Sequence, residues 1–320
     1  MGERLKGIYM TEFHHVSVLL EECIDGLNIK PDGIYVDGTL GGAGHSSRIA
    51  AKLTTGRLIG IDRDEIALAA AARRLEPYKD RVTLVHSNFC EIASVLKHLR
   101  IDGVDGILLD LGVSSPQLDD GSRGFSYMAD APLDMRMDNT DTLTAATVVN
   151  TWPYEELKRI LYDYGEERYA PQIASAICRK REQKPIATTL ELVDVIRSAM
   201  PPAALREKQH PAKRSFQAIR IAVNDELGAV EKVMRDAMPC LNPGGRLAVI
   251  TFHSLEDRIV KNAMAEAARG CTCPPNFPVC VCGKKPKVKL ITRKPIVSGD
   301  EELEVNPRAR SAKLRICEKL

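Results

Sequence analysis

Short apolar runs alternate with amphipathic stretches through the first third of the chain, as expected for alternating strands and helices. The apolar runs that predict strands are residues 33–36, 57–61, 82–85 and 106–109. The stretches that predict helices lie between them, at residues 46–53, about 65–75 and about 92–99. This order predicts an α/β fold with a parallel, doubly wound sheet.

Polar residues follow these strands, and three of them are acids: Asp37, Asp62 and Asp110. A single acid at a strand end is usually a helix cap or part of a solvated turn. In open α/β sheets, however, ligands bind beyond the carboxyl ends of the strands. Three acids at the same edge therefore predict a binding site.

Four glycines follow the first strand, in the segment "DGTLGGAGHS" at residues 37–46. Glycines of this density weaken helices and strands, so close backbone approach or positive φ angles explain them best. An ordinary tight turn is the simpler alternative. The order of strand, glycine loop and helix favours a nucleotide-binding βαβ unit.

Two kinds of cofactor fit such a unit. Asp62 follows the second strand, where an acid accepts hydrogen bonds from ribose hydroxyls in dinucleotide enzymes, and the same contact suits the adenosine of S-adenosylmethionine. The glycine spacing does not match G-x-G-x-x-G, and Asp37 would repel a pyrophosphate. A cationic sulfonium cofactor suits these carboxylates better, so we favour S-adenosylmethionine over NAD.

The alternation stops after Asp110 for about a hundred residues. Helices are expected there at 154–163, 171–182 and 189–199, and the α/β pattern then resumes with a helix near 218–238, a turn at 241–245 and a strand at 246–250. We therefore predict a methyltransferase-type α/β domain in two parts, residues 1–113 and 216–320, interrupted by a helical substrate-recognition domain at residues 114–215.

Composition and net charge further limit the classes of protein to which the chain can belong. The chain has 320 residues, of which 44% are hydrophobic and 28% charged, and its net charge is +2. A polyanion would therefore meet a local basic patch, and Arg179, Lys180 and Arg181 in the insertion are candidates for phosphate contacts. A solvated helix face is the alternative. The sequence has no membrane-length apolar run and no signal-peptide pattern, and with nine cysteines it predicts a cytoplasmic protein with reduced thiols.

Four cysteines are grouped near the C-terminus with the spacing C-x-C-x6-C-x-C, and they are Cys271, Cys273, Cys280 and Cys282. Four thiols in a short loop suit a structural zinc ion. A reduced loop without metal is the alternative. We expect no metal in the chemistry. The basic run from Lys284 to Lys294 that follows is a second candidate for contact with RNA.

Two other catalytic patterns are less well supported. His253, Ser254 and Glu256 would suit a hydrolase, but no G-x-S-x-G elbow accompanies them, and Ser254 more simply caps a helix. Cys240 follows a proline, as does the nucleophile that methylates cytosine C5. It precedes the Asn-Pro-Gly-Gly turn, away from the strand ends, so we interpret it as a core residue at the end of a helix.

The chain resembles the RsmH (MraW) family of S-adenosylmethionine-dependent methyltransferases. The resemblance rests on long motifs in order along the sequence, among them "HHVSVLLEE", "YVDGTLGGAGHS", "GIDRD", "LLDLGVSSPQLD", "PLDMRMD", "FQAIRIAVNDEL" and "LNPGGRLAVITFHSLEDRIVK". It implies methylation of N4 of a cytidine in the decoding region of 16S ribosomal RNA, within the small ribosomal subunit. The resemblance also implies the cofactor contacts, which are Ala43, Gly44, His45, Asp62, Phe89, Asp110 and Gln117.

Methylation of an exocyclic amine requires hydrogen-bond acceptors that orient its lone pair toward the methyl group. We predict Asp110, Ser115 and His253 as catalytic residues, although the segment after Asp110 departs from the usual Asp-Pro-Pro-Tyr form. Asp134 and Arg136, with Asp138 nearby, are expected to position the flipped base, or else to form an ion-pair network.

Three functions stay open at this point. The first is an RNA methyltransferase, the second a ribosome-assembly protein that keeps the cofactor fold without turnover, and the third an NAD oxidoreductase. The sequence leaves open whether the chain forms a homodimer.

Overall fold

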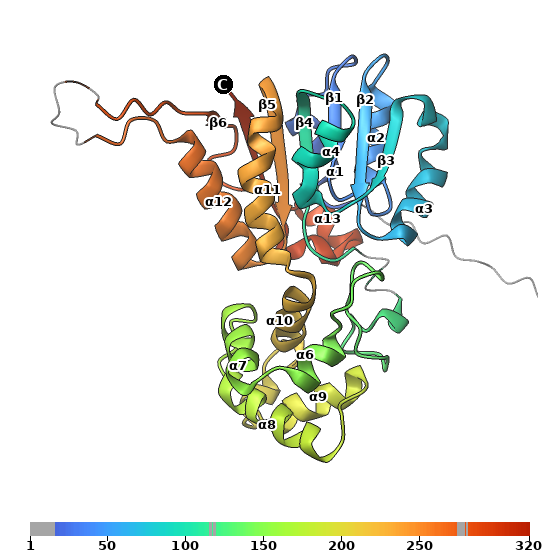
Figure 1. Ribbon diagram of the computed structural model, residues 1–320, viewed down its shortest axis with the longest axis vertical. Coiled ribbons are helices and arrows are strands. Elements are labelled where there is room, and N and C mark those ends of the chain that lie inside the picture. Colours follow the sequence, from blue (N-terminus) through green and yellow to red (C-terminus); the bar gives the residue numbers. More distant parts are fainter. Residues whose placement is uncertain (1–16, 115–116, 118–119, 274–278, 280) are drawn as a thin grey trace, which may run out of the picture.

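The chain folds into a sheet-containing body and a helical body, stacked along the long axis of the molecule (Figure 1). The computed structural model describes residues 17–114, 117, 120–273, 279 and 281–320. The helical body is formed by residues between strands β4 and β5 and lies below the sheet in Figure 1. The domain boundaries predicted at 113/114 and 215/216 stay predictions.

The sheet has seven strands in the order β3-β2-β1-β4-β5-β7-β6. Strands β1 to β5 pair in parallel, whereas β7 pairs antiparallel with both β5 and β6. The strands are β1 (Ile34–Asp37), β2 (Arg57–Asp62), β3 (Val82–His86), β4 (Val104–Asp110), β5 (Leu241–Thr251), β6 (Val288–Leu290) and β7 (Lys313–Lys319). The predicted α/β sheet is confirmed, and each of the four strands predicted before the insertion lies within two residues of its expected place.

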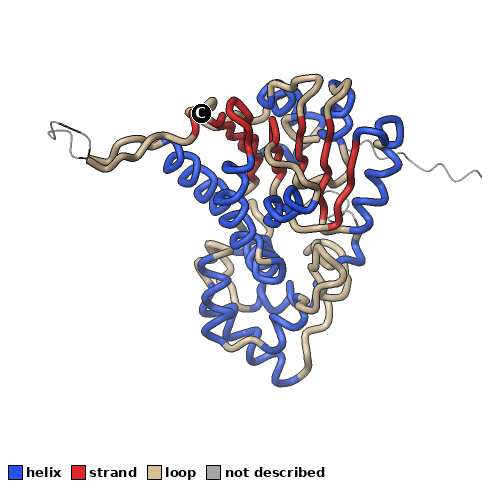
Figure 2. The backbone as a smooth tube through the Cα atoms, turned by 45° about the horizontal axis from the view of Figure 1, so that its top comes forward, coloured by secondary structure: helices blue, strands red, loops and turns tan. Residues whose placement is uncertain are grey.

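Helices cover both faces of the sheet because neighbouring strand residues point to opposite sides. In β1, Tyr35 packs into one core and Val36 into the other. The first core includes helices α1 (Leu20–Leu27), α2 (Gly44–Lys52) and α3 (Glu65–Arg74), with α13 (Asp300–Val305) beside them. The second includes α4 (Ile92–His98), α11 (Glu226–Cys240) and α12 (Ser254–Ala268), so that the sheet lies between two helical layers (Figure 2).

The helical body has a hydrophobic core of its own. Its elements are α6 (Ala145–Thr151), α7 (Tyr154–Asp163), α8 (Ala170–Gln183), α9 (Thr189–Ser198) and α10 (Lys213–Asn224). The three helices expected at 154–163, 171–182 and 189–199 are confirmed within one residue at each end. Apolar residues at helical spacing, such as Leu157, Ile160 and Leu161 in α7, explain this agreement because they form the buried face.

Two expectations about the second half of the chain are wrong. The single helix expected near 218–238 is two helices, α10 and α11, separated by Asp225, whose φ of 46° is left-handed. The expected turn at 241–245 lies inside β5, where the register with β4 shifts and Gly244 has φ 77°. Among the described residues, no helix is long and apolar enough to cross a membrane.

Candidate active site at the carboxyl edge of the sheet

The carboxyl ends of the parallel strands face the helical body, and the predicted acids gather there (Figure 1). Asp37 is 1% exposed, and its oxygens accept hydrogen bonds from Ser46 Oγ at 2.7 Å and Thr39 N at 3.1 Å. Burial raises the pKa of Asp37, because water no longer solvates its charge. In the described part of the chain, no Lys or Arg lies within salt-bridge distance of Asp37, Asp62 or Asp110.

The glycine loop joins β1 to α2. Gly41 has φ 46°, and a Cβ atom built on Gly42 meets no heavy atom within 4 Å, so the loop is open on that side. Ala43 caps α2 with φ 57°. A Cβ atom on Gly44 would lie 1.8 Å from Ser17 Oγ, so a glycine there allows the segment at Ser17 to approach the loop.

Asp62 fixes the glycine loop as well as facing it. Its Oδ2 accepts a hydrogen bond from Gly41 N at 2.7 Å, and its Oδ1 accepts one from Asp64 N at 2.9 Å. A carboxylate has about four acceptor positions, so two are left for ribose hydroxyls. Burial raises the pKa of Asp62, although the two backbone donors oppose this change.

Asp110 ends β4 beside these groups. Its backbone N–H donates to Thr39 Oγ1 at 2.6 Å, whereas its buried Oδ1 has no hydrogen-bond partner among the described residues. His45 Nδ1 lies 4.0 Å from Asp110 Oδ2, and His45 Nε2 lies 3.0 Å from Val18 O. Burial, with the charges of Asp37 and Glu256, raises the pKa of Asp110 to about 8.

Gln117 is linked to the same edge through Asp64. Gln117 Nε2 donates to Asp64 Oδ2 at 2.9 Å, and Arg123 Nη1 donates to the same oxygen at 3.1 Å. Phe89 follows β3 and packs against the second core, and its Cβ would lie 3.2 Å from a Cβ atom on Gly38. All the predicted cofactor residues therefore come from segments that meet at this edge of the sheet.

The residues at this edge fit S-adenosylmethionine. The orphaned carboxyl oxygen of Asp110 and the uncompensated carboxylates of Asp37 and Asp62 suit a ligand with a sulfonium, an ammonium group and ribose hydroxyls. The open face of Gly42 allows a ligand to approach the backbone. Bound here, S-adenosylmethionine supplies an electrophilic methyl group.

His253 lies after β5, next to the end of β4, but its role differs in part from our expectation. It caps α12 in place of Ser254: its Nδ1 accepts from Glu256 N at 3.5 Å, while its Nε2 lies 3.1 Å from Glu256 Oε1. Burial alone would raise the pKa of Glu256, but hydrogen bonds from His253 and Phe252 N, with the charge of Arg220, lower it. Ser254 Oγ donates instead to Glu166 Oε2 at 2.8 Å, which links the two bodies.

Asp134 and Arg136 form an ion pair with two hydrogen bonds, of 2.8 Å and 2.7 Å. Arg136 Nη1 also donates to two backbone carbonyl oxygens, those of Asn139 and Asp141. Asp138 Oδ2 lies 3.7 Å from His86 Nε2 at the end of β3. This segment is therefore the ion-pair network that was one of the two expectations, and it lies against the sheet edge.

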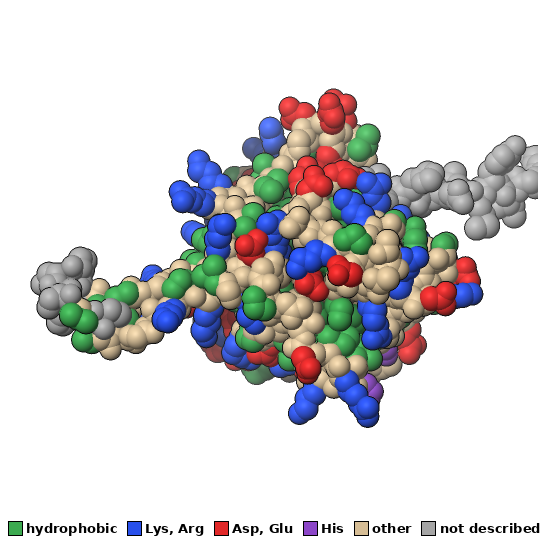
Figure 3. All heavy atoms as spheres, turned by 90° about the horizontal axis from the view of Figure 1, so that it is seen from above, with side chains coloured by type: hydrophobic (Ala, Val, Ile, Leu, Met, Phe, Trp, Pro, Cys, Tyr) green, Lys and Arg blue, Asp and Glu red, His purple; other side chains and the backbone are tan. Residues whose placement is uncertain are grey.

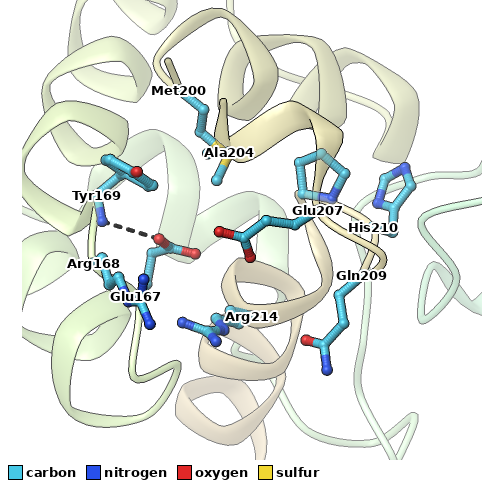
Figure 4. A pocket seen from close by; sticks show the side chains of 10 residues that line it. Glu167, Arg168, Tyr169, Met200, Ala204, Glu207, Gln209, His210 and Arg214 are labelled. Carbon is cyan, nitrogen blue, oxygen red and sulfur yellow. Dashed lines mark hydrogen bonds between the residues drawn. The ribbon is translucent and has the colours of Figure 1, made fainter. Parts of the chain in front are cut away.

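The basic residues of α8 occupy the helical body. Arg179 and Lys180 are exposed, whereas Arg181 donates to Val149 O at 2.8 Å and so helps to hold α6. A small pocket at the start of α10 is lined by acidic and basic residues, and Glu167, Glu207 and Arg214 point toward one another there (Figure 4). With a volume of about 30 Å³ this pocket holds about one water molecule, not a nucleobase.

Two predicted groups fall partly outside the described residues. Ser115 lies outside them, and so does Cys280. The other three predicted zinc ligands, Cys271, Cys273 and Cys282, come together, with their sulfur atoms all within 4.8 Å of one another.

Comparison with known proteins identifies the family. The model of the MraW methylase family matches residues 12–320. The chain belongs to the MraW methylase family. Similar curated proteins, both named ribosomal RNA small subunit methyltransferase H, come from Brevibacillus brevis and Heliobacterium mobile. The Brevibacillus protein is 60% identical over 309 residues, which cover 96% of this chain and 98% of the relative. The Heliobacterium protein is 58% identical over 311 residues, which cover 97% of this chain and 100% of the relative.

Among solved structures, a putative rRNA methylase from Clostridium thermocellum is 12% identical with a TM-score of 0.44, and covers 96% of this chain and 100% of that one. Membership of the MraW methylase family confirms the resemblance stated above and S-adenosylmethionine as the cofactor. It also removes the NAD oxidoreductase from consideration.

Sequence reasoning missed residues that shape the helical body of this methylase, and one of them, Arg123, also joins it to the sheet. Asn224 Oδ1 accepts from Met137 N at 2.8 Å, and Asn224 Nδ2 donates to Met135 O at 2.7 Å. Arg123 donates to the carbonyl oxygens of Arg136 and Met137 as well as to Asp64. The only sequence signal was a polar residue, Asn224, at a buried position of an amphipathic helix.

Proposed function

We propose that the protein transfers the methyl group of S-adenosylmethionine to the N4 amino group of a cytidine in the decoding region of 16S ribosomal RNA. The observation that carries the proposal is the near full-length similarity to proteins named ribosomal RNA small subunit methyltransferase H. The resemblance of the motifs supports N4 as the target atom and a cytidine of the decoding region as the target nucleotide. The chemistry of the site supports methyl transfer to such an amine.

The carboxylates at the sheet edge would hold the cofactor. Asp62 is suited to the ribose hydroxyls, and the backbone at Ala43, Gly44 and His45 forms the start of α2 beside them. Asp110, whose Oδ1 has no hydrogen-bond partner in the described part of the chain, is suited to a cationic group of the cofactor or to an N–H of the target amine. The roles of Ser115 and His253 in orienting that amine are part of this proposal.

The thiols near this edge argue against methylation at cytosine C5, which needs a thiolate nucleophile. Cys23 is fully buried, and burial raises its pKa well above the usual value. Burial also raises the pKa of Cys90. Cys240 ends α11 immediately before β5 begins, at the opposite edge of the sheet. These three cysteines therefore favour direct transfer to an exocyclic nitrogen.

Because the target is a base, it must leave its stack to reach the methyl group. The cofactor residues lie at the sheet edge that faces the helical body, so the base would enter between the two bodies. We propose the helical body as the RNA platform, with Asp134 and Arg136 fixing the shape of the loop that faces the edge.

The test is single-turnover methyl transfer from radiolabelled S-adenosylmethionine to small subunits and to free 16S RNA that lack the modification. Mass spectrometry of the nucleosides then identifies the product. N4-methylcytidine is expected, and it should be lost in an Asp110→Asn variant but retained in an Asp80→Asn variant, whose side chain is exposed. A product methylated at carbon C5 would contradict the proposal.

The same assay addresses the second candidate, a ribosome-assembly protein that keeps the cofactor fold without turnover. That protein would bind subunits and cofactor but transfer no label to either substrate.

A further inference from the structure

An arm extends from the sheet body between α12 and β6 (Figures 1 and 3). Its described residues are 269–273, 279 and 281–287, and most of them are exposed. The apolar side chains of Val279 and Val281 are 70% and 76% exposed, so they form no core that could hold the arm. The group of side chains that does come together here is Cys271, Cys273 and Cys282.

The spacing of these three sulfur atoms suits one metal ion. All lie within 4.8 Å of one another, and Cys271 Sγ is 3.7 Å from Cys282 Sγ. Zinc binds thiolates at about 2.3 Å in a tetrahedron, which places neighbouring sulfurs about 3.8 Å apart. Three exposed or half-exposed thiols thus already have nearly the separation that zinc requires, although the apolar side chains described in the arm, Val279 and Val281, are exposed.

Backbone amides support each sulfur atom. Thr272 N donates to Cys282 Sγ, Cys273 N donates to Cys271 Sγ, and Val281 N donates to Cys273 Sγ, each at 3.4 Å. N–H donors to sulfur stabilise thiolates and orient metal ligands. The arm therefore offers both the ligands and the hydrogen bonds around them, and these come from two segments about ten residues apart in sequence.

We propose that Cys271, Cys273 and Cys282 bind one zinc ion that ties two segments of the arm together, the one with Cys271 and Cys273 and the one with Cys282. Each thiol loses its proton to solvent as its sulfur coordinates the metal, so zinc binding releases up to three protons. The ion is structural, because the arm is separate from the sheet edge that holds the carboxylates. The proposal goes beyond the methyl transfer proposed above and does not depend on it.

Metal analysis of the full-length protein, purified under reducing conditions without chelator, tests this proposal. We expect one zinc per chain, and replacement by Co²⁺ should give the visible absorption of thiolate-bound cobalt. Cys271→Ser and Cys282→Ser should each lose at least tenfold in zinc affinity. Cys178→Ser is the matched control, because that thiol lies in α8 of the helical body, and it should retain the zinc.

Limited proteolysis provides a second readout. Chelation should make cleavage within the arm at least several-fold faster while cofactor affinity stays unchanged. The proposal is overturned if the reduced wild-type protein binds no added Zn²⁺, or if the two arm variants retain zinc as the control does. Circular dichroism and cofactor affinity, measured on every variant, separate loss of zinc from failure to fold.

Discussion

At the residue scale, Asp62 has two roles, shaping the glycine loop and binding the cofactor, of which the sequence indicated only the second. It accepts hydrogen bonds from Gly41 N and Asp64 N, and so shapes the loop that would also receive the cofactor. We expect Asp62→Ala to weaken S-adenosylmethionine binding by about 1.5–3 kcal/mol, the usual range for hydrogen bonds to a charged group. Calorimetry measures this as a rise in Kd of about 10- to 150-fold.

Asp62→Asn separates these duties, because its amide oxygen can still accept a backbone hydrogen bond. It should lose less affinity than the alanine variant. Equal affinity of wild type and Asp62→Ala would show that the glycine loop is not the cofactor site, and Asp80→Ala controls for loss of a carboxylate elsewhere.

Asp110 should make the stability of the ligand-free protein depend on pH. Its pKa is raised from 3.8 to about 8, so between these values the unfolded state is ionised while the folded state still holds the proton. The free energy of unfolding therefore falls as pH rises through this window, by at most about 1.4 kcal/mol per pH unit, and levels off above pH 8.

Asp110→Asn removes this dependence because an amide does not titrate. The melting temperature of the variant relative to wild type should therefore increase from pH 5 to pH 8 and then stay constant. Thermal melts across this range, with Asp80→Asn as the control, measure the difference. A difference that does not change with pH would mean that Asp110 is ionised in the folded protein throughout.

At the scale of elements, α10 positions the loop that faces the sheet edge. Asn224 is 5% exposed and bonds the backbone of Met135 and Met137, so its loss leaves buried N–H and C=O groups without partners. We expect Asn224→Ala to lower the free energy of unfolding by at least about 2 kcal/mol, since each orphaned group costs about 1–3 kcal/mol. Urea unfolding gives the value, and protease cleavage should increase at 134–141.

Asn139 provides the matched control because it lies in the same loop with an exposed side chain. Asn139→Ala should leave both stability and cleavage near those of wild type. If Asn224→Ala behaved in the same way, the loop would be held by Arg123 and the Asp134–Arg136 pair alone.

The regular elements could be predicted wherever local pattern and burial agree. The strands before Asp110 and the three helices of the insertion have apolar residues at the spacing that packing requires. The break between α10 and α11 escaped prediction because Asp225 adopts a left-handed conformation that has no strong local signal at an aspartate. Strand β7 was not predicted because its charged residues, including Arg315, find partners such as Asp257 only in the folded chain.

For the whole molecule, the position of the candidate site could be predicted, but much of its internal bonding could not. Acids after parallel strands must meet at one edge, which brings Asp37, Asp62 and Asp110 together. The links from the insertion, such as Arg123 to Asp64, join residues 59 positions apart and depend on how the two bodies stack. No periodic pattern in the sequence encodes that contact. Gln117 and Phe89 were identified through family resemblance alone.

The net charge is only +2, and the face opposite the helical body mixes acidic and basic side chains (Figure 3). RNA binding must therefore depend on local clusters. Of the three basic residues in α8 that were predicted to contact phosphates, Arg179 and Lys180 are exposed. Arg181 instead donates a hydrogen bond to Val149 O and contributes to packing. A second exposed group consists of Lys285 and Lys287 in the arm and Lys289 in β6.

We therefore expect the double variant Arg179→Ala and Lys180→Ala to weaken RNA binding without changing cofactor affinity or the melting temperature. On single-stranded RNA each lost phosphate contact reduces the slope of log affinity against log salt by about 0.7, so the slope should fall by about 1.4. Neutralising Lys285 and Lys287 tests the second group in the same way. If only the arm variant reduces the slope, the α8 residues are a solvated face, and the RNA platform extends from the sheet body along the arm instead.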